Sequence, residues 1–182
     1  MTNKDAWIQT YSGKKFHIFD PKPEEVDIED IAHSLSLLCR FNGHCNSFYS
    51  VAEHSIYVAQ EIIDQGHPVE LCMAALLHDS SETFIGDMSK PFKDHMDYYK
   101  EVEKNIQRVI EKKFNLPANI FDHKAIKDAD VAVLLAEKRD LMNKEPEPWS
   151  MNATPIKTKI VPVLDSTRIK KMFLSELRLI TM

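Results

Sequence analysis

Two histidines occupy positions where a hydrophobic helix face is still running. His54 comes three residues after Val51 and four before Val58, which places it on the apolar stripe of an expected helix. His78 ends the next apolar stripe, within the stretch LLHDSSETFIGD at 76–87. A histidine that faces a core is either a hydrogen-bonded core residue or a metal ligand. Taken singly, each of these histidines fits the first interpretation.

Two aspartates share such inward positions. Asp79 directly follows His78, and Asp130 lies four residues after Ile126 and three before Val133. Burying an unpaired carboxylate is costly, or it raises the pKa of the group until the group is neutral. Two inward carboxylates and two inward histidines therefore need a common partner, and a divalent cation binds both kinds of ligand. A lone HD dipeptide means little, and Asp130 alone could be a cap. The metal hypothesis therefore depends on all four residues occurring in the order H…HD…D, each at an inward helical position.

The elements that must position these residues are expected to be helices. The chain has 182 residues, of which 43% are hydrophobic and 28% charged, as in a soluble globular protein. Only four glycines occur, and alternating β-branched runs are scarce. We expect an all-α helical bundle that forms a single domain over residues 1–182. Its core would span about 27–142, with an N-terminal arm (1–26) and a C-terminal loop and helix (143–182).

Capping signals mark several helix boundaries. Asp27 is a candidate N-cap, and Ser50 with Glu53 forms a capping box that opens the next helix. Gly66 is expected to end that helix, and Pro68 is expected as the first residue of the following one. The remaining expectations are helices over about 98–114, over 123–142 and after Asp165, a short hairpin near SGKKF, a loop at 145–149, and a strand or extended arm at 156–163.

Charge, hydropathy and cysteine content limit the expected partners. The net charge is −5 with no lysine or arginine block, so duplex nucleic acid is not expected as a partner. No apolar run reaches signal-peptide or membrane-spanning length, so no membrane partner is expected. Three cysteines without a CxxC pair favour a reduced, cytoplasmic setting. The last helix and the N-terminal arm could form a homo-oligomer interface or complete one core.

The order of the four candidate ligands resembles a known signature. His54, His78-Asp79 and Asp130 resemble the metal-binding motif of the HD-domain phosphohydrolases, an all-helical superfamily. HDSSETFIGD is similar to the bacterial 5'-deoxynucleotidase branch, and DIAHSLSLLCRF resembles small phage and bacterial HD hydrolases, some of which act on dATP. The resemblance covers roughly residues 27–142. It implies that the four residues hold a divalent ion, which could be Mn, Co, Zn, Ni, Fe or Mg.

The same resemblance implies that Glu82 and Asp87 are catalytic acids beside the metal. Glu82 lies four residues after His78, so it shares that face if the helix continues, and it could hold or deprotonate the attacking water. Asp87 could orient the water or protonate the leaving oxygen. An exposed acid at a helix end is the alternative for Glu82. Glu137, on the face of Asp130, could orient a ligand, pair with an arginine, or form a surface salt bridge.

The stretch LCRFNGH places an arginine and an aromatic residue upstream, as in nucleotide-binding members. Arg40 is the candidate phosphate clamp, because a guanidinium matches a phosphate in a two-pronged fork. Phe41, where the deoxynucleotidases tend to have Trp, could stack on a base or fill the core. His44 could contact phosphate. Lys90 and Lys93 could add positive charge for further phosphates, or could be solvated loop lysines.

The expected activity is metal-dependent hydrolysis of the 5'-phosphate ester of a nucleotide substrate. A dNMP would give deoxynucleoside plus phosphate, whereas a dNTP such as dATP would give deoxynucleoside plus triphosphate. The second substrate needs more positive charge, for which Lys14 and Lys15 are further candidates. A cyclic-nucleotide phosphodiesterase is another possibility, and a two-metal oxygenase would need paired histidines that the sequence lacks. A non-catalytic nucleotide sensor is the alternative from another class, although all four ligands, Glu82 and Asp87 are present.

Overall fold

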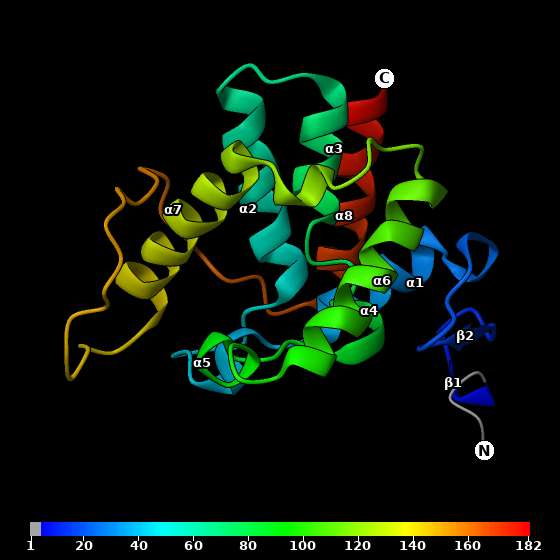
Figure 1. The fold of residues 1–182 in the computed structure, drawn as a ribbon. Helices are drawn as coiled ribbons and strands as arrows, with labels where there is room; N and C mark the ends of the chain where they lie inside the picture. The colour runs from blue at the N-terminus through cyan, green and yellow to red at the C-terminus, as the bar shows by residue number, and fades with distance from the viewer. Residues whose placement is uncertain (1–4) are drawn as a thin grey trace.

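Helices form nearly all of the regular structure in residues 5–182, which are the residues that this computed structural model describes (Figure 1). The paired strands of that range, β1 (Trp7–Gln9) and β2 (Lys15–His17), form one small antiparallel hairpin. The expectation of an all-α bundle is therefore confirmed, as is the short hairpin near SGKKF.

The central helix of the bundle is α2, which packs against α1, α3, α7 and α8 (Figure 1). The longer helices are α1 (Ile28–Leu37), α2 (Val51–Asp64), α3 (Val69–Leu77), α6 (Asp97–Lys113), α7 (Lys124–Leu141) and α8 (Ser166–Thr181). Shorter segments are α4 (Glu82–Ile85), α5 (Lys90–Lys93) and the 3-10 turns η2 (Pro23–Glu25), η3 (Arg40–Gly43) and η4 (Ile120–Asp122).

The caps expected from the sequence are formed. The side chain of Asp27 accepts a backbone N–H from the first turn of α1. Asp165, after which a helix was expected, also caps α8 in this way. Ser50 and Glu53 form both hydrogen bonds of the capping box at the start of α2. Each cap of this kind stabilises a helix by about 1 kcal/mol. The start of α2 is therefore fixed, and His54 follows four residues after the cap.

The hydrophobic core includes both ends of the described chain. Phe16 of the hairpin is fully buried and stacks on Phe84 of α4, with ring centroids 3.5 Å apart. Ile169 and Phe173 of α8 are also fully buried, and α8 packs against α1, α2 and α3. The N-terminal arm and the last helix thus complete the same core. Within residues 5–182, no helix combines the length and the apolarity that crossing a lipid bilayer requires.

Helix α3 does not continue through Glu82, so the condition under which Glu82 would share the face of His78 is not met. The helix ends at Leu77, and the backbone then tightens, with Ser80 N–H bonded to Leu77 O (3.0 Å) and Glu82 N–H to Asp79 O (3.0 Å). His78 explains the change, because its Nδ1 bonds the carbonyl of Ala75 at 2.8 Å. In a continuing helix that carbonyl would accept the N–H of residue 79 instead. A turn, rather than a helix face, therefore follows the His-Asp pair.

The position of Pro68 also differs from the expectation. Pro68 is the N-cap of α3, with an extended ψ of 154°, and the helix begins one residue later. Pro91 lies in the first turn of the short helix α5. Proline is tolerated there because the first N–H groups of a helix have no partner within the helix.

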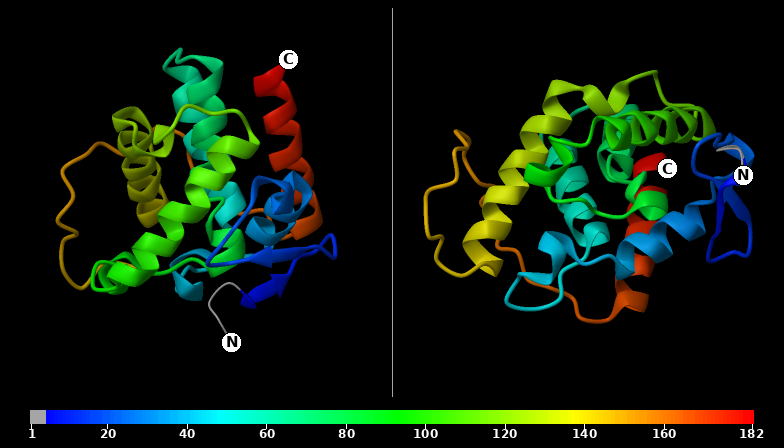
Figure 2. Two further views of the ribbon diagram at one scale, coloured as in Figure 1. Left: turned by 45° about the vertical axis from the view of Figure 1, so that its right-hand side comes forward. Right: turned by 60° about the horizontal axis from the view of Figure 1, so that its bottom comes forward.

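Residues 156–163 form an extended arm, not a strand. Side chains and one carbonyl take the place of a strand partner: Ile156 N–H bonds Ala132 O (3.2 Å), Ile160 N–H bonds Asp140 Oδ2 (2.8 Å), and Val163 N–H bonds Glu53 Oε1 (2.7 Å). We call residues 156–163 the strap. It follows the loop outside α7 and connects that loop to α8 (Figure 2).

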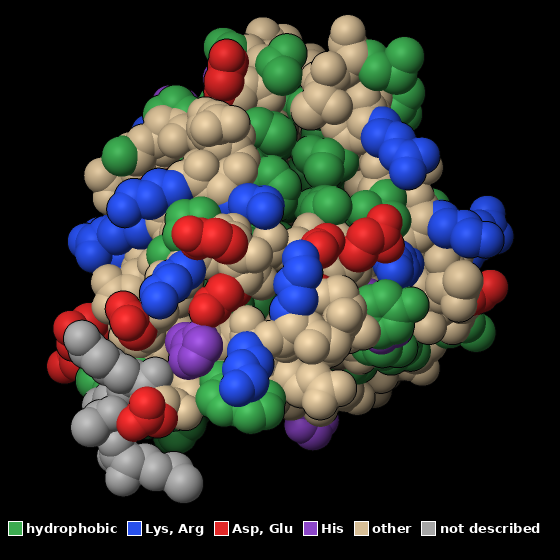
Figure 3. All heavy atoms as spheres, turned by 90° about the vertical axis from the view of Figure 1, so that its right-hand side faces the viewer, with side chains coloured by type: hydrophobic (Ala, Val, Ile, Leu, Met, Phe, Trp, Pro, Cys, Tyr) green, Lys and Arg blue, Asp and Glu red, His purple; other side chains and the backbone are tan. Residues whose placement is uncertain are grey.

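Basic and acidic side chains are interspersed on the face of the molecule shown in Figure 3. The arrangement there is a mixed surface, as expected for a chain with a net charge of −5 and no lysine or arginine block.

Candidate metal centre

His54, His78 and Asp79 bring metal-binding atoms to one place. His54 lies in the first turns of α2, and His78 and Asp79 lie in the turn after α3, so the packing of these two helices forms the group. One ligand atom from each residue lies within 4.8 Å of the others. The histidine ring centroids are 5.3 Å apart. This group could hold a metal ion.

Each histidine has one ring nitrogen bonded by the protein and the other left for a ligand. Nδ1 of His54 lies 2.7 Å from Glu137 Oε1, and Nδ1 of His78 lies 2.8 Å from the carbonyl of Ala75. Both acceptors favour the tautomer with its proton on Nδ1. Both Nε2 atoms are buried and have no hydrogen-bond partner among the described residues. Neutral histidines oriented in this way are suited to bind a divalent cation through Nε2.

Asp130, expected as the fourth ligand, approaches the group from α7. Its Oδ1 is 3.0 Å from Nε2 of His54, although the contact lacks the geometry of a hydrogen bond. Asp130 is not part of the set within 4.8 Å, and its side chain is 41% exposed. Three of the four expected ligands are therefore clustered. The fourth, Asp130, lies beside them and is more exposed to solvent.

Glu137 connects His54 to Arg40. Its carboxylate is fully buried; Oε1 contacts His54, and Oε2 accepts hydrogen bonds from Nη2 (3.1 Å) and Nε (3.3 Å) of Arg40. Nη1 of Arg40 lies 3.7 Å from Oδ2 of Asp79. Glu137 therefore has two of the roles considered for it: it orients the candidate ligand His54, and it pairs with Arg40. The guanidinium expected to clamp a phosphate is therefore held next to the candidate ligands.

Charges in the group shift the pKa values of its members in opposite directions. Burial and Arg40 oppose protonation of His54, but the carboxylates of Glu137 and Asp130 outweigh them and raise its pKa to about 9. Burial opposes ionisation of Asp79, but the two histidines and Arg40 hold its pKa below the ordinary value. The site therefore favours positive charge at the histidine nitrogens, which either a proton or a metal cation can supply.

Glu82 is buried beside the group, at the start of α4. Burial, followed by the negative charges of Asp79 and Asp87, raises the pKa of Glu82 well above its ordinary value. Its Oε2 has no hydrogen-bond partner within residues 5–182. The turn after His78 thus brings Glu82 near Asp79 without a continued helix. The alternative of an exposed acid is not observed, since Glu82 is 8% exposed.

Asp87 is positioned by a glycine turn and by α6. Gly86 has a φ of +80°, a conformation that favours glycine, and its carbonyl accepts a 2.8 Å hydrogen bond from the Tyr99 hydroxyl. Burial raises the pKa of Asp87 despite the positive charge of Arg40. Lys93 pairs with Glu103 of α6, and its charge lowers the pKa of both Glu82 and Asp87. Lys93 therefore adds positive charge to the surroundings of both acids. Tyr99 and Glu103 were not among the expected site residues.

His44 and three of the candidate lysines form no hydrogen bond or ion pair with the candidate ligands within the described residues. His44 is exposed. Each lysine has another partner: Lys90 with Asp94 (3.2 Å), Lys14 with Asp27 (2.7 Å), and Lys15 with the ring of Trp7 (4.6 Å).

Phe41 is half-buried but does not belong to the hydrophobic core. Its ring lies 5.3 Å from the guanidinium carbon of Arg40 and 6.4 Å from the ring of Trp149. Of the two roles considered for Phe41, filling the core is therefore not the one observed. Trp149 was not recognised from the sequence, because nothing in the loop EPEPW indicates which surface it contacts.

Comparison with known proteins places the chain in a family. YfdR, an uncharacterized protein of Escherichia coli strain K12, is 38% identical over 136 residues, which are 75% of this chain and 72% of YfdR. An uncharacterized protein of Rhodobacter capsulatus is 38% identical over 121 residues, covering 63% of this chain and 61% of its own length. No family model matches the chain. The extent and identity of the first relationship show that the chain belongs to the family of YfdR.

Proposed function

We propose that the protein is a metal-dependent phosphohydrolase of the HD-domain superfamily that cleaves the 5'-phosphate ester of (deoxy)nucleotides. The observation that supports this most strongly is the pair of buried Nε2 atoms of His54 and His78, each left for a ligand next to Asp79. A divalent ion bound there would lower the pKa of a bound water and polarise the phosphorus centre. His54, His78, Asp79 and Asp130 are the residues that would hold it.

Arg40 is the residue proposed to bind the phosphate. Glu137 and Asp79 hold its guanidinium from two sides, and its side chain is 11% exposed. A guanidinium fixed in this way loses little conformational freedom when it binds an anion. Its position beside Asp79 would align the phosphate with the metal ligands.

Glu82 and Asp87 are proposed to move the protons. An acid–base group is most effective when its pKa lies near the working pH, and the pKa of each of these carboxyls is raised by burial. Glu82, whose Oε2 has no partner among the described residues, would hold and deprotonate the attacking water. Asp87 would orient that water or protonate the leaving 5'-oxygen.

A nucleoside monophosphate is the proposed substrate, in preference to a triphosphate. A triphosphate would need several additional cations, yet Lys14, Lys15 and Lys90 each contact another side chain instead of a candidate ligand. Among the described residues, Arg40 and Lys93 both contribute positive charge that lowers the pKa values of Glu82 and Asp87. This supply of positive charge fits a single phosphate group. The expected products are a deoxynucleoside and orthophosphate.

Product analysis tests this proposal. The protein would be stripped with a chelator, reloaded with Mn²⁺ or Co²⁺, and given matched panels of dNMPs and dNTPs, with the products identified by mass spectrometry. We expect nucleoside and orthophosphate from the dNMPs. Intact triphosphate released from a dNTP would instead assign a triphosphohydrolase. Nucleotide binding without turnover under any metal would contradict the enzyme proposal and favour a nucleotide sensor.

The chain offers a matched control within one helix. Asp130 and Asp128 are two residues apart in α7, but Asp130 faces His54 and Asp128 pairs with Lys124 at the surface. Asp130→Asn should reduce phosphate release strongly, whereas Asp128→Asn should not alter it. Equal losses in both variants would contradict the assigned site.

A further inference from the structure

Two aromatic side chains lie together beside the proposed phosphate clamp, and neither belongs to the hydrophobic core. Phe41 comes from the turn η3, next to Arg40, and Trp149 comes from the loop between α7 and the strap. Their ring centroids are 6.4 Å apart, with an angle of 44° between the ring planes. Both side chains are partly exposed, so each presents aromatic surface to solvent.

The backbone of η3 turns Phe41 out of the core. Phe41 and Asn42 have φ values of 54° and 51°, in the left-handed region. Asparagine adopts this region readily, whereas for a bulky residue such as phenylalanine it is unusual. Hydrogen bonds on both sides hold the turn, from Arg40 N–H to Tyr49 O (2.9 Å) and from His44 N–H to Phe41 O (3.0 Å). Strained backbone of this kind is concentrated at functional sites.

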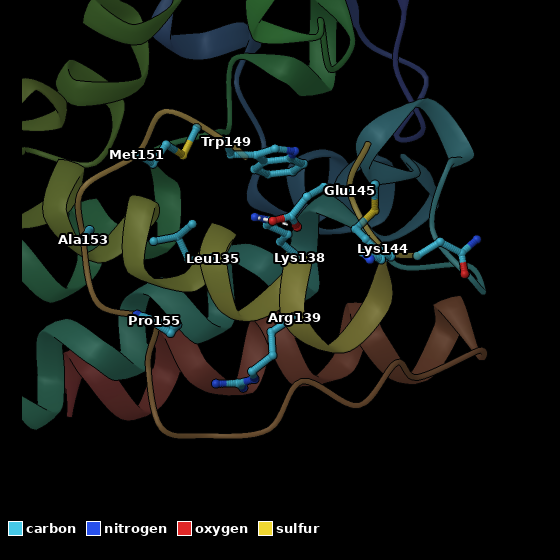
Figure 4. Close-up of a pocket in the computed structure, with 11 residues that line it drawn as sticks. Leu135, Lys138, Arg139, Lys144, Glu145, Trp149, Met151, Ala153 and Pro155 are labelled. Atoms are coloured by element: carbon cyan, nitrogen blue, oxygen red, sulfur yellow. Dashed lines mark ion pairs between the residues drawn. The ribbon is translucent and has the colours of Figure 1, made fainter. Parts of the chain in front are cut away.

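Trp149 forms one wall of a groove along α7. The groove has a volume of about 520 Å³, within the usual range of small-molecule sites, and runs between α7 and the loop at 143–155. Figure 4 shows the indole lying across Lys138 and Glu145, with Leu135 and Met151 further along the groove. Nζ of Lys138 is 5.1 Å from the indole ring and 2.8 Å from Glu145. Lys138 is therefore paired with Glu145 while it lies over the indole, and Trp149 remains partly exposed to solvent.

The distances connect this aromatic pair to the candidate metal centre. Arg40 is 3.7 Å from Asp79, its guanidinium carbon is 5.3 Å from the Phe41 ring, and that ring is 6.4 Å from Trp149. A ligand whose phosphate binds Arg40 would thus have its next planar group within reach of these rings. Planar heteroaromatic groups stack on such side chains.

We propose that Phe41 and Trp149 form the nucleobase-binding surface of the protein, with Trp149 as a base-stacking residue supplied by the loop after α7. This inference rests on the proposed function, because it takes the phosphate of the same ligand to be bound by Arg40. Stacking alone tolerates all bases, since every base has an aromatic face. The surface therefore predicts preference for nucleotides over sugar phosphates, with little discrimination among bases.

Tryptophan fluorescence tests the contact directly, because the chain has only Trp7 and Trp149. The Trp7→Phe protein, which retains Trp149, would be titrated with 2'-deoxyadenosine or with 2'-deoxyribose in the presence of Mg²⁺. Neither probe has a phosphate, so neither can be turned over as a phosphate ester. We expect the nucleoside to change the Trp149 emission and the sugar to leave it unchanged. The matched Trp149→Phe protein, which retains Trp7, should not respond.

Kinetics provide the second readout. Trp149→Ala should raise the KM for dNMPs about tenfold while kcat changes little, because stacking aids binding more than chemistry. The preference for dNMPs over 2'-deoxyribose 5-phosphate should fall by a similar factor. Trp149→Phe, which keeps an aromatic face, should recover most of that preference. Trp149 lies partly exposed in a loop, so these changes should not prevent folding.

The outcomes separate this inference from the proposed function. If dNMPs are hydrolysed but Trp149 does not respond to the nucleoside and Trp149→Ala keeps its KM, the base-binding assignment is wrong and the hydrolase remains. If the nucleoside changes Trp149 emission but no phosphate is ever released, the base site is supported and the hydrolase proposal fails. An equal response in the Trp149→Phe protein would also overturn the assignment.

Discussion

The carboxylate of Glu137 lies 2.7 Å from Nδ1 of His54, and both side chains are fully buried. The other oxygen of the same carboxylate holds Arg40. One group thus sets the orientation of a candidate metal ligand and of the candidate phosphate clamp. Burial opposes its ionisation, but the charges of Arg40 and His54 lower the pKa of Glu137. It therefore remains ionised near neutral pH and can accept both hydrogen bonds.

Replacing Glu137 should weaken metal binding without removing any ligand. In Glu137→Gln the side chain keeps its size but loses its charge, so the imidazole of His54 is oriented less strongly. We expect divalent-metal affinity to fall by about 10- to 100-fold, the usual effect of changing a group that orients a ligand. Competition with a chromogenic chelator would measure it. The control is Glu101→Gln on the exposed face of α6, and equal affinity in both variants would contradict this role.

Metal removal should destabilise the protein. A ligand that binds only the folded state stabilises it by about 2.7 kcal/mol when its concentration is a hundred times its Kd. For a chain of this length, that corresponds to a Tm lower by about 5–10 °C after chelation. Differential scanning calorimetry with and without Mn²⁺ would measure the shift. The Tm of Asp79→Asn should change little on adding metal. A wild-type Tm that is the same with and without metal would contradict the proposed site.

Glu82→Gln should reduce activity without reducing stability. The pKa of Glu82 is raised because its ionised form is buried near Asp79 and Asp87, so an uncharged amide relieves that repulsion. We expect turnover to fall by about 10²- to 10⁴-fold, as when an acid–base group is lost. Its Tm should equal or exceed that of the wild type. A large loss of Tm together with activity would instead indicate a structural role.

Asp140 should make the attachment of the strap sensitive to acid. The pKa of Asp140 is lowered chiefly by its hydrogen bonds with Arg139, and also by the N–H of Ile160. A lowered pKa means that this stabilisation is present above the unfolded value, about 4, and is lost as the pH falls through the folded value. Asp140→Asn should therefore be about 1 kcal/mol less stable at pH 7, and this difference should shrink as the pH falls below about 4.

Urea unfolding at pH 7 and at a series of lower pH values would measure this difference. Asp64→Asn, on the exposed end of α2, serves as the control and should change stability by less than about 0.5 kcal/mol. A difference between wild type and Asp140→Asn that did not shrink as the pH was lowered would show that the charge of Asp140 is not its cause.

Local signals were sufficient to predict most helices and the central part of the site. The capping box at Ser50 and Glu53 fixes the start of α2, and the apolar stripe then places His54 inward. The break after His78 could not be predicted, because it depends on a side-chain hydrogen bond to the carbonyl of Ala75. The periodicity of the sequence was consistent with either a break or a continued helix.

Contacts between distant segments were harder to predict. The strap was left as either a strand or an arm, since its N–H groups bond Asp140 and Glu53, which only the folded chain brings near. Trp149 lacks a local signal for the same reason: its neighbour Phe41 is more than a hundred positions away. Lys90 and Lys93 looked alike in sequence, but only Lys93 meets a carboxylate of α6, Glu103.

The most direct test of the account is a stoichiometric activity titration. Mn²⁺ would be added to metal-free protein in the presence of the four dNMPs, and orthophosphate release would be measured at each ratio of metal to chain. We predict that the rate rises with added metal and saturates near one equivalent per chain, and that Asp79→Asn remains inactive throughout. Saturable metal binding without phosphate release, or turnover unaffected by Asp79→Asn, would contradict the central claim.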